Sequence, residues 1–327
     1  MGSYDLPHQT LDASNIVTIG AAIQRTSVRA DKLAEMTRAE QAALVAWLRR
    51  PGVVWSAVTE QLEEYGSVQR AAAAQAPAQG SLFEAAQTDG HDEAARDLDR
   101  WDRAGIQMVC VLDADYPSNL RMIHQHPPVL FMRGTTDDRD ATSVAVVGTR
   151  QPTPRGIDQA RRLAAGLATS DIPVISGLAA GIDTAAHTAA LAAGGRTVAV
   201  IGTGIDRAYP PQNAGLQEEI AAQGLVISQF LPGAPPTKAS FPMRNAVMSG
   251  YALATVVVEA ADRSGSRGQA RLALQHGRHV FLMRSLLEHQ WARDYAERPG
   301  VTVVEAADDV FVGLQRLASD STDLVWT

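Results

Sequence analysis

From Trp101 onward, short apolar runs rich in Val and Ile alternate with Ala- and Leu-rich segments that are long enough for helices. Continuous Val/Ile runs are typical of strands buried on both faces, and their alternation with helices indicates a parallel sheet. The predicted strands span residues 144–147, 174–176, 197–201, 225–228, 255–259, 279–283 and 301–304. The predicted helices between them span residues 157–169, 184–193, 215–222 and 268–276. The pattern therefore predicts a doubly wound α/β domain over residues 141–317.

The first hundred residues have a helical pattern instead. Residues 38–50 and 55–65 carry apolar side chains at helical spacing, and Pro51-Gly52 separates the two segments. Residues 69–95 are rich in Ala and Gln without an apolar period, which indicates a flexible connection or a weakly packed helix. We therefore expect a small N-terminal helical domain (1–68), a low-complexity linker (69–100), a connecting segment (101–140), the α/β domain (141–317) and a C-terminal tail (318–327).

Length and composition agree with a protein of about two domains, because 46% of the 327 residues are apolar. The sequence has no uninterrupted apolar run of 18 residues and no N-terminal signal pattern, so we expect a cytoplasmic location and no membrane partner. The single cysteine, Cys110, excludes an intramolecular disulfide and a cluster of thiolate metal ligands. We expect it to be a buried strand residue.

The charge is distributed unevenly along the chain. The net charge is −7, yet residues 141–285 contain 13 Lys and Arg against 8 Asp and Glu. A basic block inside an acidic chain is consistent with an anionic ligand at one face, and scattered solvated arginines explain it about as well.

Three successive predicted strands end in glycine, at Gly148, Gly177 and Gly202. In an open parallel sheet the ligand crevice lies at the carboxyl ends of the strands, beside a switch in strand order. The backbone N–H groups of the helix starts that follow are unpaired and favour an anion, above all a phosphate. The dinucleotide fingerprint fails because Gly202-Thr203-Gly204 lacks the third glycine, and no P-loop pattern occurs. An NAD enzyme or an ATPase is therefore not expected.

Gly, Ser, Thr and Arg groups at the strand ends suit a phosphate cradle that has no nucleophile and base. A hydroxyl and a guanidinium in Gly148-Thr149-Arg150 can both bind phosphate. We predict a groove that follows a sugar-phosphate backbone, without a catalytic residue, a metal or a cofactor. The predicted nucleic-acid-binding residues are Gly148, Thr149, Arg150, Thr153, Ser176, Gly177, Gly202, Gly204, Lys238, Phe241, Arg244, Asn245, Ser264, Gly265, Ser266 and Arg267.

Aromatic residues make up only 5% of the chain, so Tyr209, Phe241 and Tyr251 are the few candidates for base stacking near the groove. Binding should therefore depend on phosphate contacts and weaken with salt. Asp183 and His187 lie four apart on one predicted helical face. Because no third ligand accompanies them, we interpret the pair as a cap and an interhelical hydrogen bond and not as a metal site.

The combination of motifs resembles the DNA-processing protein A (DprA, also called Smf) family. The resemblance lies, in order, in the segments VAVVGTR (144–150), SGLAAGIDTAAH (176–187), AVIGTGID (199–206), FPMRN (241–245) and SGS (264–266). It implies a Rossmann-like domain that binds single-stranded DNA, forms dimers and, in transformable bacteria, loads the RecA recombinase onto incoming DNA. It implies no catalytic activity.

The sequence departs from that family's pattern at several positions. Relatives usually have Arg at the position of Ala246, Glu at the position of Gln229 and Leu-Ile-Thr at residues 267–269, where this chain has Arg-Gly-Gln. The family's common C-terminal winged-helix module is not expected, because the chain ends soon after Leu317. We therefore interpret the chain as a divergent member that lacks this module.

Three functions stay open from the sequence. The first is a non-catalytic, homodimeric single-stranded DNA-binding protein that grips phosphates at the strand ends and assists recombinase loading. The second is a regulatory or antitoxin-like protein of a phage-defence module, with a partner encoded in the same operon. The third is a nucleoside monophosphate hydrolase, for which Glu259 is the one carboxylate at a predicted strand end that can act as acid or base.

Overall fold

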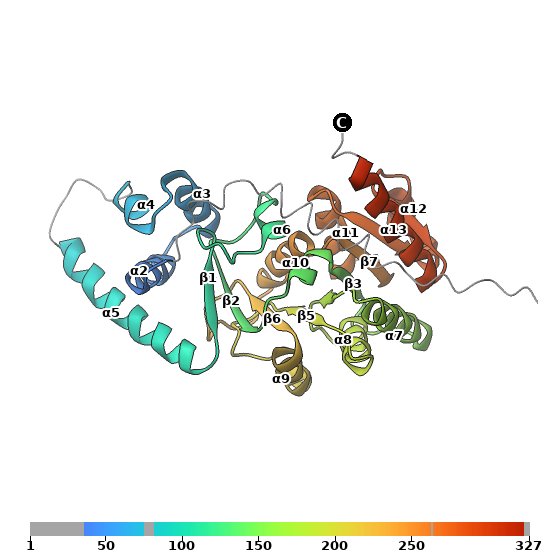
Figure 1. Cartoon of the computed structure of the whole chain (residues 1–327), viewed down its shortest axis with the longest axis horizontal. Coiled ribbons are helices and arrows are strands. Elements are labelled where there is room, and N and C mark those ends of the chain that lie inside the picture. The colour runs from blue at the N-terminus through green and yellow to red at the C-terminus, as the bar shows by residue number, and fades with distance from the viewer. Residues whose placement is uncertain (1–35, 75–81, 263, 324–327) are drawn as a thin grey trace, which may run out of the picture.

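The computed structural model describes residues 36–74, 82–262 and 264–323 (Figure 1). The expectations for residues 1–35 and 324–327, within the predicted helical domain and tail, lie outside the described residues. Within the described part of the chain, no helix is both long and apolar enough to span a membrane.

One sheet runs through the described residues, and its nine strands lie in the order β1-β2-β6-β5-β4-β3-β7-β8-β9. Neighbouring strands from β6 to β9 in this order are parallel, whereas β1 and β2 are antiparallel to their neighbours. The strands are β1 (Gln107–Cys110), β2 (Val129–Gly134), β3 (Val144–Gly148), β4 (Val174–Ser176), β5 (Thr197–Val200), β6 (Leu225–Ser228), β7 (Ala254–Glu259), β8 (His279–Met283) and β9 (Val301–Val304). The predicted α/β class, with a doubly wound and mostly parallel Rossmann-like sheet, is confirmed.

Two of these strands precede residue 141, where the predicted sheet began. β2 pairs antiparallel with both β1 and β6, and so extends the parallel sheet at one edge. The sequence prediction relied on strands that alternate with crossover helices. Between β1 and β2 the chain has only loops and the four-residue α6 (Ser118–Arg121), so this signal was missing. The predicted connecting segment therefore contributes two strands to the sheet.

Helices cover both faces of the sheet (Figure 1). One layer contains α7 (Pro154–Thr169), α8 (Ile182–Ala192), α9 (Ala214–Gln223) and α13 (Ala307–Asp323). The other contains α6, α10 (Ser240–Tyr251) and α11 (Gly265–Gln275), and α12 (Gln290–Ala296) packs beside β9. Short 3-10 helices are η2 (Asp138–Thr142), η3 (Pro211–Asn213) and η4 (Arg284–Glu288). Every residue of β4, β5 and β6 is buried between the two layers, which explains their continuous apolar sequences.

The N-terminal helices are α2 (Arg38–Leu48), α3 (Trp55–Tyr65), α4 (Val68–Ala74) and α5 (Leu82–Arg103). The expected low-complexity linker is therefore helical over most of its described length, and α5 packs against α2. Ala94, Leu98 and Trp101 are buried at helical spacing, and the Trp101 ring meets the Phe131 ring of β2 edge-on at 5.2 Å. The sequence prediction missed this apolar face because it is narrow and the surrounding residues are alanines and charged side chains. The division of the chain into domains stays a prediction.

The strand order reverses at β3. The chain continues from β3 to β4, β5 and β6 on one side, and then crosses to β7, β8 and β9 on the other side. β3 and β7 are parallel neighbours, so the connections that leave their carboxyl ends run to opposite faces of the sheet. Open α/β sheets bind ligands at such a switch point.

Candidate nucleic-acid interface

A cleft of about 370 Å³ opens at the carboxyl ends of β3 and β7. It is lined by the loop after β3, by the N-terminal part of α10 and by the start of α11. We call it the switch-point cleft. It brings together most of the predicted site, namely Gly148, Thr149, Arg150, Phe241, Arg244, Asn245, Ser264, Gly265 and Ser266.

An exposed cation and two aromatic rings form a row that begins in the cleft lining, at Arg150 and Phe241, and continues to Tyr209 outside it. The guanidinium carbon of Arg150 lies 5.1 Å from the ring centroid of Phe241. The Phe241 ring in turn lies 5.6 Å from the ring of Tyr209, which is 40% exposed. Stacking on Phe241 restrains the otherwise free side chain of Arg150. The row therefore offers a positive charge for a phosphate beside ring faces on which a base can stack.

Gly202 makes room for this row. A Cβ atom at Gly202 would lie 3.0 Å from Cδ1 of Phe241, so a side chain there would press on the ring. Gly202 is itself buried and does not line the cleft. Its role is therefore to position Phe241 and not to contact a ligand.

Arg244 lines the cleft but is almost fully buried. It is 5% exposed, and its Nη1 donates to the backbone oxygen of Val200 at 3.1 Å. Burial lowers the pKa of Arg244 and raises the pKa of Asp183, while the charge of each residue partly counteracts the shift in the other. Its predicted contact with nucleic acid stays a prediction, but so little of its guanidinium is exposed that a ligand would interact mainly with its charge. Arg244 is a fixed positive charge below the ligand position.

The turn after β4 is shaped around Arg244. A Cβ atom at Gly177 would lie 1.4 Å from Nη1 of Arg244, so a side chain there would displace the guanidinium. The N–H groups of Gly177 and Ala179 donate to Oδ2 of Asp183 at 3.2 and 3.3 Å. The carboxylate of Asp183 therefore takes these two backbone donors, which a phosphate was expected to use.

The start of α11 is the helix end that opens into the cleft. The Ser264 side chain caps it by accepting from the N–H of Arg267 at 3.2 Å, and its first turn has no acidic residue. Such a helix N-terminus favours an anion. Asn245 links α10 to this end by a long hydrogen bond of 3.4 Å from its Nδ2 to the backbone oxygen of Gly265.

Gln269 is a part of the cleft that the sequence analysis missed. Its side chain is 1% exposed, and neither its amide oxygen nor its nitrogen finds a partner among the described residues. Nε of Arg244 is equally unpartnered within that part of the chain. Buried polar groups normally form hydrogen bonds, so the unpaired amide of Gln269 and Nε of Arg244 suit a polar ligand in the cleft. The available signal was a glutamine on the otherwise small, buried face of α11.

Thr153 and the start of α7 do not form a phosphate site. The Thr153 hydroxyl accepts from the N–H of Gly156 at 3.1 Å and donates to Oε2 of Glu259 at 2.9 Å. The Glu259 carboxylate also accepts from the N–H of Thr153. A carboxylate of the protein therefore occupies the position at this helix end where a phosphate was expected.

Ser176 and Gly204 have structural roles. Ser176 is fully buried and its hydroxyl donates to the backbone oxygen of Val146 at 2.7 Å, so it faces β3 and not a ligand. The N–H of Gly204 donates to the backbone oxygen of Ala234 at 2.9 Å, and a Cβ there would lie 2.6 Å from the nitrogen of Gly233. Both were predicted to contact nucleic acid, and hydrogen bonds inside the fold already use these groups.

Lys238 and Arg267 are exposed but lie outside the cleft lining. Lys238 stands in the loop that leads into α10, and Arg267 donates to the backbone oxygen of Asp262 at 3.2 Å. They can extend a binding surface beyond the cleft. Tyr251 is not available for stacking, because it is 4% exposed and its hydroxyl donates to Asp140 at 2.9 Å.

Asp183 and His187 belong to the scaffold. His187 is fully buried and its Nδ1 lies 2.7 Å from Oγ1 of Thr197 on β5, so its bond joins a helix to a strand and not to another helix. Burial, with a smaller contribution from Arg244, lowers the pKa of His187 to about 3. The described residues contain no group of three or more His, Cys, Asp or Glu side chains that could hold a metal.

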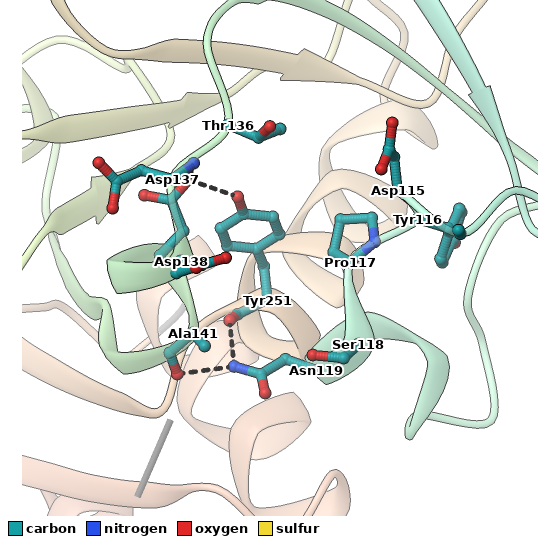
Figure 2. A pocket seen from close by; sticks show the side chains of 12 residues that line it. Asp115, Tyr116, Pro117, Ser118, Asn119, Thr136, Asp137, Asp138, Ala141 and Tyr251 are labelled. Carbon is teal, nitrogen blue, oxygen red and sulfur yellow. Dashed lines mark hydrogen bonds between the residues drawn. The ribbon is translucent and has the colours of Figure 1, made fainter. Parts of the chain in front are cut away.

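A second cleft, of about 510 Å³, is acidic (Figure 2). Asp115, Asp137 and Asp138 line it together with Asp140. Asp140 is held by Arg196 at 2.6 Å and by the Tyr251 hydroxyl. The carboxylates in this cleft repel a polyanion, so the switch-point cleft is the better candidate for nucleic acid.

Comparison with known proteins identifies the family. The family model described as DNA recombination-mediator protein A matches residues 107–312, which is more than half of the chain. The chain belongs to this family. The predicted resemblance to DprA and Smf proteins is thereby confirmed.

Two curated relatives show the extent of the likeness. The chain is 43% identical over 171 residues to the DNA processing protein DprA of Streptococcus pneumoniae, with 52% of this chain and 60% of the relative covered. It is 41% identical over 188 residues to Protein Smf of Synechocystis, with 56% and 47% covered. The chain thus spans about half to three-fifths of the length of these relatives.

Solved structures of the family share the fold. The X-ray structure of DprA from Streptococcus pneumoniae matches with a TM-score of 0.68 at 30% identity, covering 85% of this chain and 98% of that chain. DprA from Helicobacter pylori, whose structure is described for a unique single-stranded DNA binding mode, matches with a TM-score of 0.58 at 26% identity, covering 64% and 96%.

Proposed function

We propose that this protein binds single-stranded DNA at the switch-point cleft and carries out no reaction on it. The observation that carries the proposal is the exposed Arg150 guanidinium, which is held over Phe241. The start of α11, whose first turn has no acidic residue, lines the same cleft. A phosphate at this position meets the guanidinium, the helix N-terminus and the buried charge of Arg244. The family membership and the single-stranded DNA binding named for the Helicobacter pylori relative support this assignment.

The aromatic row explains how one strand, and not a duplex, is selected. Phe241 and Tyr209 lie next to the phosphate position. The unpaired bases of a single strand can stack on such rings, whereas the bases of a duplex are held in their pairs. Lys238 lies in the loop that immediately precedes α10 and supplies a further phosphate contact along the strand. We further propose, from the family's description as a recombination mediator, that a homodimer delivers the bound strand to a recombinase.

The hydrolase alternative is disfavoured by one observation. Both carboxylate oxygens of Glu259, the expected acid or base, accept hydrogen bonds from Thr153 at the start of α7. A general base must reach the water that it activates, and this carboxylate is held by the helix start instead. A regulatory role with a protein partner is compatible with DNA binding and predicts binding of the same strand.

The decisive experiment measures binding of a fluorescent oligothymidine by anisotropy at about 50 mM and about 200 mM salt. We expect the wild-type protein to bind, and Arg150→Glu to weaken binding by at least about tenfold, because a phosphate contact becomes a repulsion. Arg161→Glu, the same charge change on the exposed side of α7, is the matched control and binds as wild type. Equal binding by all three proteins would refute the proposal, and so would hydrolysis of AMP without DNA binding.

A further inference from the structure

A second groove opens at the same edge of the sheet, on the other side of α10. Gln229 directly follows β6 and Pro128 directly precedes β2, the strand that pairs with β6, so both lie at the carboxyl end of β6. The groove has a volume of about 530 Å³. Trp55 of α3, Met243 and Ala246 of α10 complete the part that matters here. We call it the β6 groove.

α10 separates this groove from the switch-point cleft. Phe241, Arg244 and Asn245 line the cleft, whereas Met243 and Ala246 line the groove. α10 itself starts at Ser240 without a side-chain cap and without an acidic residue in its first turn. A strand held in the cleft can therefore cross the exposed start of α10 and reach the groove without meeting a carboxylate on the helix.

The groove wall contains an unsatisfied polar group. Gln229 is 5% exposed, and its Nε2 finds no partner in the described part of the chain. A buried donor without an acceptor is uncommon in native proteins. The amide therefore suits a ligand that brings an acceptor into the groove.

The rest of the groove is lined by apolar side chains and by polar ones such as Gln125 and Gln275. Trp55 and Pro128 present flat surfaces, and Met243 is 46% exposed at the mouth. No carboxylate lines this groove among the described residues, and Arg271 lies at its edge. A ligand with an apolar flat body, an acceptor at its edge and a negative group beside it matches these walls.

We propose that the β6 groove receives one base of the bound single strand. The base stacks on the apolar walls and accepts a hydrogen bond from the Gln229 amide, while its phosphate faces Arg271. This inference rests on the proposed function, because it places a second contact on the same strand.

The test measures affinities for oligothymidines in which an abasic site is moved along the strand, one position at a time. For the wild-type protein we expect one position outside the Phe241 contact at which loss of the base weakens binding by at least about fivefold. The double variant Gln229→Glu/Ala246→Arg fills the groove with two larger or charged side chains. In this variant the abasic penalty at that position disappears, while binding still depends on Arg150.

Met243→Glu is the second variant, because an exposed side chain at the groove mouth can change without a loss of folding. It weakens binding of intact strands, and its matched control, Met122→Glu, changes a methionine that is 66% exposed and lies outside the groove. If both groove variants keep the wild-type abasic pattern, the groove takes no base and the inference is wrong, although the DNA-binding proposal stands. If the wild-type protein binds no strand at all, both proposals fail.

Discussion

Burial decides what each charged residue at the strand ends can do. Arg150 and Arg244 both line the switch-point cleft, yet Arg150 is exposed over Phe241 and Arg244 is locked below it. The sequence contained both arginines but not their depth, because depth depends on Gly177 and α10 coming together across the sheet. For the same reason, the predicted roles of Ser176 and Thr153 differ from their observed hydrogen bonds within the fold.

Gly177→Ala tests the fixed position of Arg244. The added methyl group would lie 1.4 Å from Nη1 of Arg244, so the guanidinium must leave its place. We expect a loss of about 1–3 kcal/mol in the free energy of unfolding and weaker strand binding. Gly215→Ala is the control, since nothing lies within 4 Å of its added atom. Equal urea denaturation curves for the two variants would contradict the observed packing.

We expect the free energy of unfolding to fall in mild acid because His187 is buried. Its pKa is about 3 in the folded protein against an ordinary value of 6.5, so below 6.5 the unfolded chain binds a proton that the folded chain excludes. The free energy of unfolding therefore falls by about 1.4 kcal/mol per pH unit as the pH drops from 6.5 towards 3 on account of this group. Urea denaturation from neutral pH downwards measures the slope.

The variant His187→Asn separates this group from the others. It is less stable at neutral pH, but its stability falls less steeply below 6.5 because the excluded proton is gone. His276, with a pKa lowered to about 4, contributes equally to both proteins and cancels in the comparison. Parallel slopes for wild type and variant would show that His187 takes up its proton in the folded state.

At the scale of elements, the regular parts of the fold could be predicted and the irregular ones could not. All seven predicted strands exist: six are largely buried apolar runs between the helix layers, and β9 is a partly buried apolar run at the edge of the sheet. β1 and β2 lack the flanking helices on which the prediction relied, and the apolar face of α5 is only one residue wide per turn. The site was predictable where it follows strand ends, at β3 and at the start of α11. Gln269 was not, because only packing shows that its amide is buried.

Glu259 links two elements, since a side chain at the end of β7 caps the start of α7. Glu259→Ala removes the acceptor of the Thr153 N–H and the favourable charge at the helix end. We expect a loss of about 0.5–2 kcal/mol in the free energy of unfolding, measured by urea denaturation. Strand binding is retained, because the carboxylate takes no part in the cleft. A stable variant that no longer binds the strand would place Glu259 among the ligand contacts instead.

For the whole molecule, the arrangement of charge matters more than its sum. The net charge is −7, but the carboxylates of Asp115, Asp137 and Asp138 gather in the acidic cleft (Figure 2), which shares no lining residue with the switch-point cleft. The switch-point cleft combines Arg150 with helix N-terminal amides, and Asp183 is the one carboxylate that lines it among the residues that the structure describes. An acidic protein can therefore bind a polyanion at one edge of its sheet.

The salt dependence of binding measures how many phosphates that edge contacts. For single strands, the slope of the logarithm of the binding constant against the logarithm of the salt concentration is about −0.7 for each phosphate neutralised. Arg150→Gln removes one such contact, so the slope becomes shallower by about 0.7, whereas Arg161→Gln leaves it unchanged. Lys238→Gln reports whether the strand continues along the loop before α10, and we expect the same reduction. Identical slopes for the Arg150 and Arg161 variants would mean that the phosphates lie elsewhere on the molecule.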